Sequence, residues 1–180
     1  EFEKKINKKV INLKIEHPFE DESGARWLLN EFDGKYSLNF SNLNSKIISN
    51  FIYEYIYTMN QSGSEGASDS TYGWDNYFNH YLYMSGWTYK GRMIGNPLFT
   101  VGKNPGRYNN GLYVINNRLK AHHFGISGKI GIKVNFRILL TFSQNYGIFP
   151  DQNYYQLISK DYKFDDGLEQ LSSLYEIKLK

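Results

Sequence analysis

The most regular alternation in the chain runs over Phe124–Ser143, FGISGKIGIKVNFRILLTFS. A period of two places its even and odd side chains on opposite faces of a β ribbon, whereas an α-helix would scatter both sets around its axis. Small or polar side chains fill the odd positions, with Leu139 the clear exception. Ser127-Gly128-Lys129 is turn-compatible and predicts a tight hairpin here. The apolar even positions are Phe124, Ile126, Ile130, Ile132, Val134, Phe136, Ile138, Leu140 and Phe142.

Ile132–Ser143 is a long predicted strand, close to the ~9–11 residues with which a tilted strand crosses a bilayer. Its polar face carries Lys133, Asn135 and Arg137 in succession, which the dry core of a sandwich would not tolerate. The strand is therefore expected to separate an apolar exterior from a wet interior. Lys133 and Arg137 would then face the lumen, either making it mildly basic or forming pairs with acidic residues.

Length and composition limit the alternatives. A chain of 180 residues is the size of a single unit. Its net charge of +3 is too small and too evenly spread to favour nucleic acid as a partner. The absence of Cys excludes disulfides and thiolate metal sites. The aromatic content of 17% suits a barrel with interfacial girdles, a surface that stacks on sugars, or an ordinary β core.

Further alternating segments predict strands on both sides of this stretch. Residues of about 60–111 break the pattern and are expected to form a long functional loop, which can hide short strands around Gly86–Arg92. Long and short connections alternate along the chain, as they do in outer-membrane barrels. About six strands cannot close a barrel, since the smallest bacterial ones have about 8, so either the loop adds strands or the chain is one arc of a larger barrel. The predicted strands are Val10–Glu16, Tyr36–Phe40, Ile47–Met59, Leu112–His123 and Leu171–Lys180, with a short turn at Asn42–Ser45.

Several motifs between Asp75 and Gly147 carry a family resemblance. They are Asp75–Asn79, Ser85–Arg92 (SGWTYKGR), Ile94–Phe99 (IGNPLF), Asn116–Arg118, Ala121–Gly125 and Tyr146-Gly147. They resemble the C-terminal part of Bacteroidota members of the Wzi capsule-assembly family. The resemblance implies an antiparallel outer-membrane β-barrel of roughly 18 strands, of which residues 1–180 would be the C-terminal arc. The N-terminal part of the same barrel, or a partner chain, would supply the remaining strands.

The resemblance also implies a role. Such a chain would sit in the outer membrane with its apolar face against lipid and its loops at the cell surface. It would hold or assemble capsular or surface polysaccharide without catalysing a reaction, and it would need no cofactor. Two other hypotheses stay open: a soluble carbohydrate-binding β-sandwich, whose apolar faces would pack sheet on sheet, and a channel or structural subunit of an envelope complex.

Candidate ligand-binding residues gather in the long loop. Trp74, Trp87 and Tyr89 could stack on the apolar faces of sugars, while Lys90 and Arg92 pair with uronate carboxylates. The alternative is that these residues plug or brace the barrel, or anchor the loop at the membrane interface.

Metal and catalytic sites are not expected. His122 and His123 are neighbours on a predicted strand and should point to opposite faces, so the two cannot ligate one ion. Gly125–Lys129 (GISGK) does not match the nucleophile elbow of hydrolases.

Overall fold

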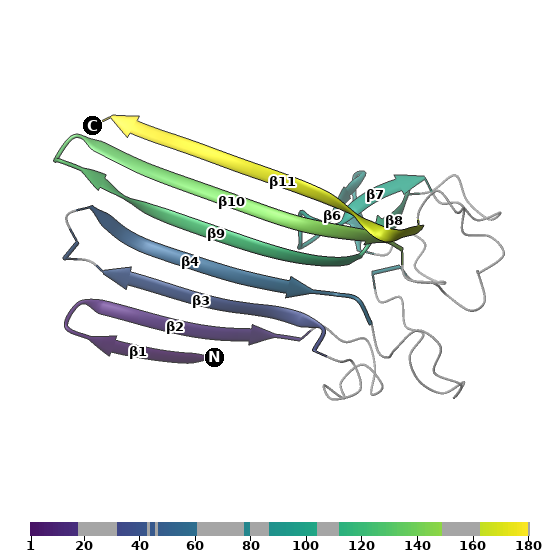
Figure 1. Cartoon of the computed structure of the whole chain (residues 1–180), viewed down its shortest axis with the longest axis horizontal. Helices are drawn as coiled ribbons and strands as arrows, with labels where there is room; N and C mark the ends of the chain where they lie inside the picture. The colour runs from purple at the N-terminus through teal and green to yellow at the C-terminus, as the bar shows by residue number, and fades with distance from the viewer. Residues whose placement is uncertain are drawn as a thin grey trace.

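A computed structural model of the chain describes residues 1–17, 32–42, 44–45, 47–60, 78–79, 87–103, 112–148 and 163–179. Its regular structure is all β, which confirms the predicted class. Seven strands form one antiparallel sheet in the order β1-β2-β3-β4-β9-β10-β11 (Figure 1). In the described ranges no helix is long and apolar enough to span a membrane. The strands of this sheet are β1 (Phe2–Ile6), β2 (Lys9–Glu16), β3 (Gly34–Asn42), β4 (Ile48–Tyr57), β9 (Arg118–Ile130), β10 (Val134–Gly147) and β11 (Lys163–Leu179).

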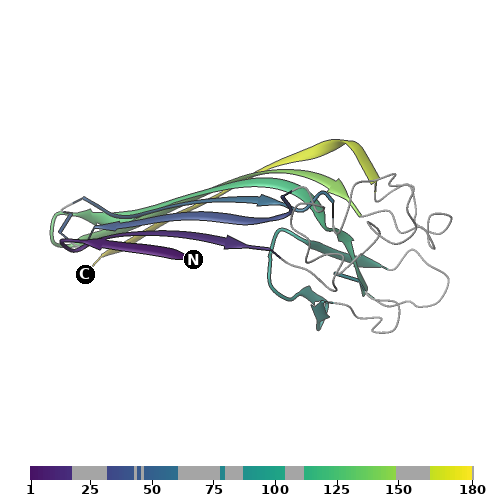
Figure 2. The same cartoon turned by 90° about the horizontal axis from the view of Figure 1, so that it is seen from below.

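Two small sheets lie in the segment between β4 and β9. One pairs β5 (Thr88–Tyr89) with β6 (Arg92–Met93), and the other pairs β7 (Thr100–Lys103) with β8 (Leu112–Asn116). Both lie at one end of the large sheet and to one side of it (Figure 2). The part of the long loop that the structure describes therefore has regular structure of its own.

Short turns join the strands at the opposite end of the large sheet (Figure 1). Asn7 and Lys8 connect β1 to β2 with φ values of 44° and 61°, the left-handed pair that a two-residue hairpin turn requires. The predicted turn at Asn42–Ser45 is confirmed, since the Ser45 N–H donates to the Asn42 carbonyl at 3.1 Å. The third turn, Gly131–Lys133, joins β9 to β10. The long connections all leave the other end, which we call the loop end.

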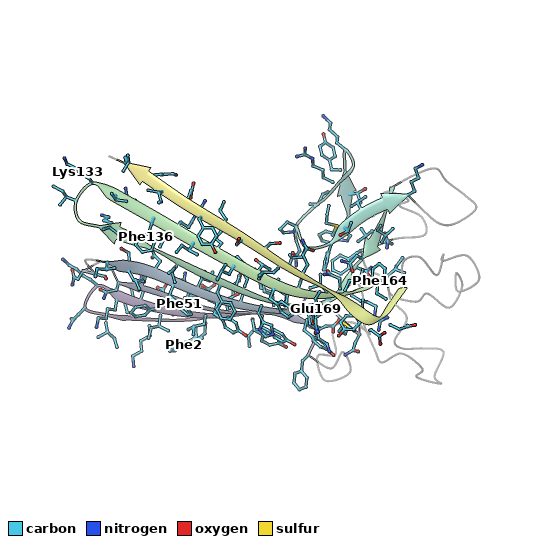
Figure 3. The ribbon with its side chains drawn as sticks, turned by 45° about the horizontal axis from the view of Figure 1, so that its top comes forward. Phe2, Phe51, Lys133, Phe136, Phe164 and Glu169 are labelled. Atoms are coloured by element: carbon cyan, nitrogen blue, oxygen red, sulfur yellow. The ribbon has the colours of Figure 1, made fainter. Side chains whose placement is uncertain are left out.

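The expected hairpin at Ser127–Lys129 was wrong, because these residues lie inside β9. Gly128 serves close packing rather than a turn: a Cβ there would collide with the Ile47 carbonyl, to which the Lys129 N–H donates at 2.7 Å. The turn three residues later uses Gly131 at φ +61°. Lys133 therefore lies in that turn, at the turn end of the sheet (Figure 3), and the expected place of its side chain on the polar face of a strand was wrong.

Three other boundaries also differ from expectation. The single strand expected over Leu112–His123 is divided at Asn117 into β8 and β9, which belong to different sheets. β11 is longer than predicted and contains Asp165–Gly167, where Gly167 has φ +74° beside an irregular register. The charged segment Phe2–Ile6 was not expected to be a strand and forms β1.

The register sorts the side chains of the large sheet onto two faces, because directly paired residues point to the same side. Even positions of β9 and β10 share one face, as predicted, since Ile126 pairs with Ile138 and Phe124 with Leu140. We call this the apolar face and its opposite the polar face. One row across the apolar face is Leu13, Leu38, Tyr53, Phe124, Leu140 and Ser173, and one row across the polar face is Lys14, Ser37, Glu54, His123, Thr141 and Ser172.

Candidate functional site

Tyrosines mark the end of the apolar face nearest the loop end. Successive rows there change from apolar to aromatic and then to polar side chains. The second row is Ile15, Tyr36, Tyr55, His122, Phe142 and Leu171, and the third is Gly34, Tyr57, Lys120, Gln144 and Glu169. The apolar face thus has a sharp boundary across β3, β4, β9 and β10.

Contacts bind this boundary into a continuous belt. The rings of Tyr36 and Tyr55 stack with their centroids 6.3 Å apart, and the ring centroids of Tyr55 and His122 are 4.9 Å apart. A hydrogen bond of 2.9 Å joins the Tyr53 hydroxyl to His122 Nδ1. Lys120 Nζ lies 5.8 Å from the ring centroid of Tyr57 and 5.4 Å from that of Tyr146. We call these seven residues, Tyr36, Tyr53, Tyr55, Tyr57, Tyr146, Lys120 and His122, the tyrosine belt.

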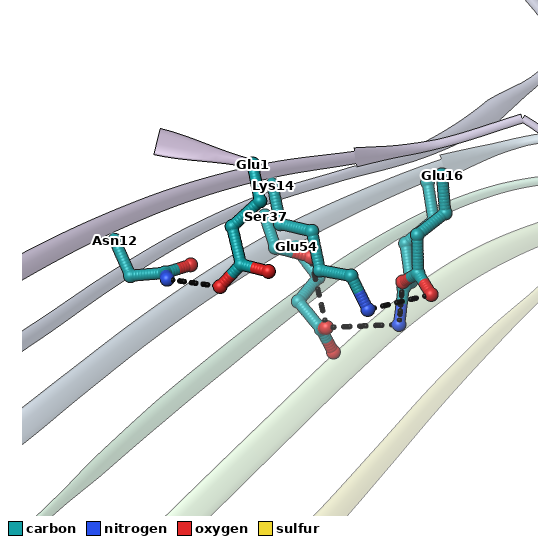
Figure 4. Close-up of polar contacts among 7 residues, drawn as sticks. Glu1, Asn12, Lys14, Glu16, Ser37 and Glu54 are labelled. Carbon is teal, nitrogen blue, oxygen red and sulfur yellow. Dashed lines mark hydrogen bonds and ion pairs between the residues drawn. The ribbon is translucent and has the colours of Figure 1, made fainter. Parts of the chain in front are cut away.

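The polar face carries charges that pair with one another (Figure 4). Glu16 accepts from Lys14 at 2.8 Å and from Lys35 at 2.6 Å, and Lys35 also lies 3.6 Å from Glu54. Ser37 Oγ donates to the Glu54 carboxylate at 3.1 Å. Side chains of both signs therefore form one network across β2, β3 and β4.

Arg137 lies on the same polar face, as predicted, but not as a free cation. Its Nε lies 2.8 Å from the Glu176 carboxylate on β11. The polar face thus carries ion pairs. Of the two arrangements that the sequence left open for Arg137, the structure contains the pair with an acidic residue.

The loop end of the polar face is covered. Phe78, Phe99 and Val114 from the segment between β4 and β9 pack on Ile56, Leu119 and Ala121 of the large sheet. The rings of Phe78 and Phe99 pack edge to face with their centroids 4.3 Å apart. This cluster is the buried core, so the described part of the long loop folds back onto the polar face instead of extending away from it.

Buried polar side chains hold the cover together and tie it to the large sheet. Asn79 bonds the backbone of Val114 twice, once as donor and once as acceptor, at 2.8 Å each. Asn116 donates to Asn145 Oδ1 at 2.9 Å and accepts from the Gly147 N–H at 3.1 Å. Asp33, fully buried, accepts from the N–H groups of Met59 and Asn60. Asn79 and Asn116 stand in motifs quoted for the family resemblance, but their hydrogen bonds were not predicted from the sequence.

The β5–β6 hairpin displays most of the candidate ligand-binding residues. Lys90 and Gly91 have φ values of 46° and 78°, which give the two-residue turn of a tight hairpin. Tyr89 pairs with Arg92, and the Ile94 N–H donates to the Trp87 carbonyl at 2.8 Å. These four residues therefore share one side of the hairpin, which we call its outward face.

The other side of the hairpin faces the core. Thr88 pairs with Met93, and Met93 packs against the buried cluster. On the outward face Trp87 is 53% exposed, Tyr89 is 65% exposed, and Arg92 is exposed as well. Lys90 Nζ lies 5.5 Å from the centroid of the Tyr89 ring. The fold thus brings together Trp87, Tyr89, Lys90 and Arg92, while Trp74 lies outside the described residues.

The two adjacent histidines point to opposite faces, as predicted. His122 bonds Tyr53 on the apolar face, and His123 Nδ1 lies 2.7 Å from Thr141 Oγ1 on the polar face. Across the described ranges, no three His, Asp or Glu side chains lie close enough together to hold a metal ion.

No family model matches the chain, and neither a curated protein nor a solved structure matches it. The resemblance of residues 75–147 to capsule-assembly proteins therefore stays a hypothesis.

Proposed function

We propose that the chain forms one arc of an outer-membrane β-barrel that holds surface polysaccharide on the cell without catalysing a reaction. Further strands, from the rest of a larger protein or from a partner chain, would close the barrel against β1 and β11. One observation carries the proposal: a seven-stranded sheet keeps a continuous apolar face that ends sharply at a tyrosine belt.

The height of the apolar face fits a bilayer. On β9 it runs from His122 to Ile130, roughly 27 Å along a strand at about 3.4 Å per residue. A strand tilt of about 40° shortens this to about 21 Å across the membrane, close to the apolar band of about 25 Å on outer-membrane barrels. Tyrosine, with an apolar ring and a polar hydroxyl, is suited to the boundary where hydrocarbon meets headgroups.

The exposed side chains of the apolar face also favour contact with lipid. Phe124, Tyr175 and Ile177 are 44%, 67% and 73% exposed. A soluble protein rarely leaves such a contiguous apolar surface open to water. The ion pairs of the opposite face suit a wet interior, because charged groups taken into a dry core lose solvation that pairing does not fully return.

The two ends of the sheet support an orientation. Short turns at one end and long connections at the other are the arrangement of outer-membrane barrels, with the long connections outside the cell. The β5–β6 hairpin would then stand at the cell surface. Exposed aromatic and cationic side chains there supply the contacts by which a protein holds a sugar chain.

Two adjacent residues of β10 test the proposal. Asn135 lies on the polar face and Phe136 on the apolar face, and both are half-buried. The chain has no Cys, so N135C and F136C each give a single reactive thiol. In outer membranes a water-soluble maleimide should label N135C and not F136C, whereas a lipid-soluble probe should show the reverse. Equal labelling of both, or release of the protein by a carbonate wash, would contradict the barrel and favour the soluble sandwich.

A further inference from the structure

We propose that the outward face of the β5–β6 hairpin binds a polysaccharide whose sugars carry carboxylates, as uronic acids do. The inference rests on the proposed function and deepens it by naming the ligand class and the residues that recognise it. The surface consists of Trp87, Tyr89, Arg92 and Ile94, with Lys90 in the adjoining turn.

The hairpin holds these side chains in a fixed arrangement. Its turn has the backbone conformation that keeps two short strands paired. Met93 anchors its inner side in the buried cluster, and the Trp87 N–H donates to the Phe78 carbonyl at 3.2 Å. A preorganised surface loses less conformational freedom on binding, so more of the contact energy is expressed as affinity.

Two aromatic rings stand ready for stacking. Trp87 directly precedes β5 and Tyr89 ends it, so the two residues are separated by roughly 7 Å along an extended chain. The Trp87 and Phe78 rings pack edge to face with their centroids 6.5 Å apart. This contact supports one side of Trp87, and about half of the Trp87 side chain stays exposed. Ile94, 49% exposed, extends the apolar strip beside it. Such an open strip fits the apolar C–H faces of consecutive sugars in a chain.

The charge of this region points to an acidic ligand. Between Asn76 and Pro150 the sequence has nine Lys and Arg and no Asp or Glu, so all 18 acidic residues lie outside it. The expectation that charge is evenly spread was therefore wrong, since the overall +3 conceals a basic centre. Within the described ranges, neither Lys90 nor Arg92 belongs to an ion pair. Of the nine cations, Lys90 and Arg92 stand on the hairpin itself, and two cations placed together attract anions.

The hairpin places a guanidinium beside stacking rings, a combination that suits a sugar bearing a carboxylate. The planar guanidinium of Arg92 matches a carboxylate with two parallel hydrogen bonds. Arg92 lies directly across the hairpin from Tyr89, so a ring stacked on Tyr89 can place its carboxylate at Arg92. An acidic peptide offers carboxylates without flat C–H faces, which leaves the stacking side chains unused.

The test uses the purified protein in detergent and polygalacturonate fragments of defined length. A matched ligand is the same polymer after chemical reduction of its carboxylates to alcohols. We expect binding to polygalacturonate that weakens as salt rises, and at least tenfold weaker binding to the reduced polymer. R92Q should lower the affinity about tenfold. R92K should recover part of the affinity, because Lys restores the positive charge but not the two parallel hydrogen bonds of the guanidinium.

The control variant is K133Q, which removes the same charge from the exposed turn at the far end of the sheet. K133Q should bind as the unmodified protein does. Equal loss in R92Q and K133Q, equal binding of the reduced polymer, or equal binding of polyglutamate or single-stranded DNA would overturn the inference. A protein that stays in the outer membrane but ignores polygalacturonate refutes this inference alone. One that binds polygalacturonate but leaves the membrane in a carbonate wash refutes the barrel alone.

Discussion

The Asn116 side chain spans two sheets, donating to Asn145 Oδ1 at 2.9 Å while its own oxygen accepts from the Gly147 N–H. Asn116 ends β8 of a small sheet, and Asn145 and Gly147 end β10 of the large one. This amide therefore ties the cover to the large sheet, beside the Asn117 N–H that donates to the Gly147 carbonyl at 3.0 Å.

Removing this amide should loosen the cover. N116A removes the hydrogen bonds that Asn116 makes to Asn145 Oδ1 and to the Gly147 N–H, a cost of about 1–3 kcal/mol for buried groups. We expect faster amide hydrogen exchange in β7 and β8 with unchanged exchange in β2 and β3. The control is N39A, at an exposed position of β3, which should change stability by no more than about 0.5 kcal/mol. Unchanged exchange in N116A would show that the cover does not depend on this contact.

Gly128 should not tolerate a side chain. A Cβ there collides with the Ile47 carbonyl, which is backbone and cannot rotate away. G128A should destabilise the protein by about 1–3 kcal/mol, the usual cost of overpacking, measured by denaturant unfolding in detergent. S127A is the matched neighbour, and it should lose only the exposed hydrogen bond that Asn50 donates. If G128A is as stable as S127A, the close approach of β4 to β9 is wrong.

A charge introduced on the apolar face tests whether lipid or water covers that face. Leu140 lies in the middle of that face and is 37% exposed. If lipid covers it, L140R should cost about 2–4 kcal/mol and lower the amount of assembled protein in the outer membrane. T141R, its neighbour on the polar face, should assemble nearly normally. Normal assembly of L140R would indicate that this face meets water.

Loss of one aromatic ring should weaken the hold on polysaccharide. W87A removes a stacking surface, which in aromatic stacking on nucleic acid bases contributes about 1–3 kcal/mol. We expect cells carrying W87A to shed more surface polysaccharide into the medium, at equal levels of the protein in the outer membrane. I132A alters an exposed side chain in the turn at the opposite end and serves as the control. Retention equal to that of the control would remove Trp87 from the site.

The alternation of Phe124–Ser143 was enough to predict strands and to assign their faces. Successive side chains of a strand point to opposite sides whatever the strand pairs with, so Ile126 and Arg137 could be assigned before any partner was known. The misplaced turn did not disturb this assignment, because even positions pair with even positions across Gly131–Lys133. The two histidines were placed correctly for the same reason.

Features that depend on distant partners could be seen only in the folded chain. Gly128 looked like a turn residue because the approach of Ile47, about 80 positions earlier in the chain, leaves no local sign. The pairing of β4 with β9 brings the long loop back over the polar face, which makes Met93 a core residue and leaves Trp87, Tyr89 and Arg92 exposed together. Which side chains share a face can be predicted from the sequence, since it follows from the backbone of a single strand. Which faces are covered depends on contacts between residues far apart in the chain, and no period in the sequence encodes them.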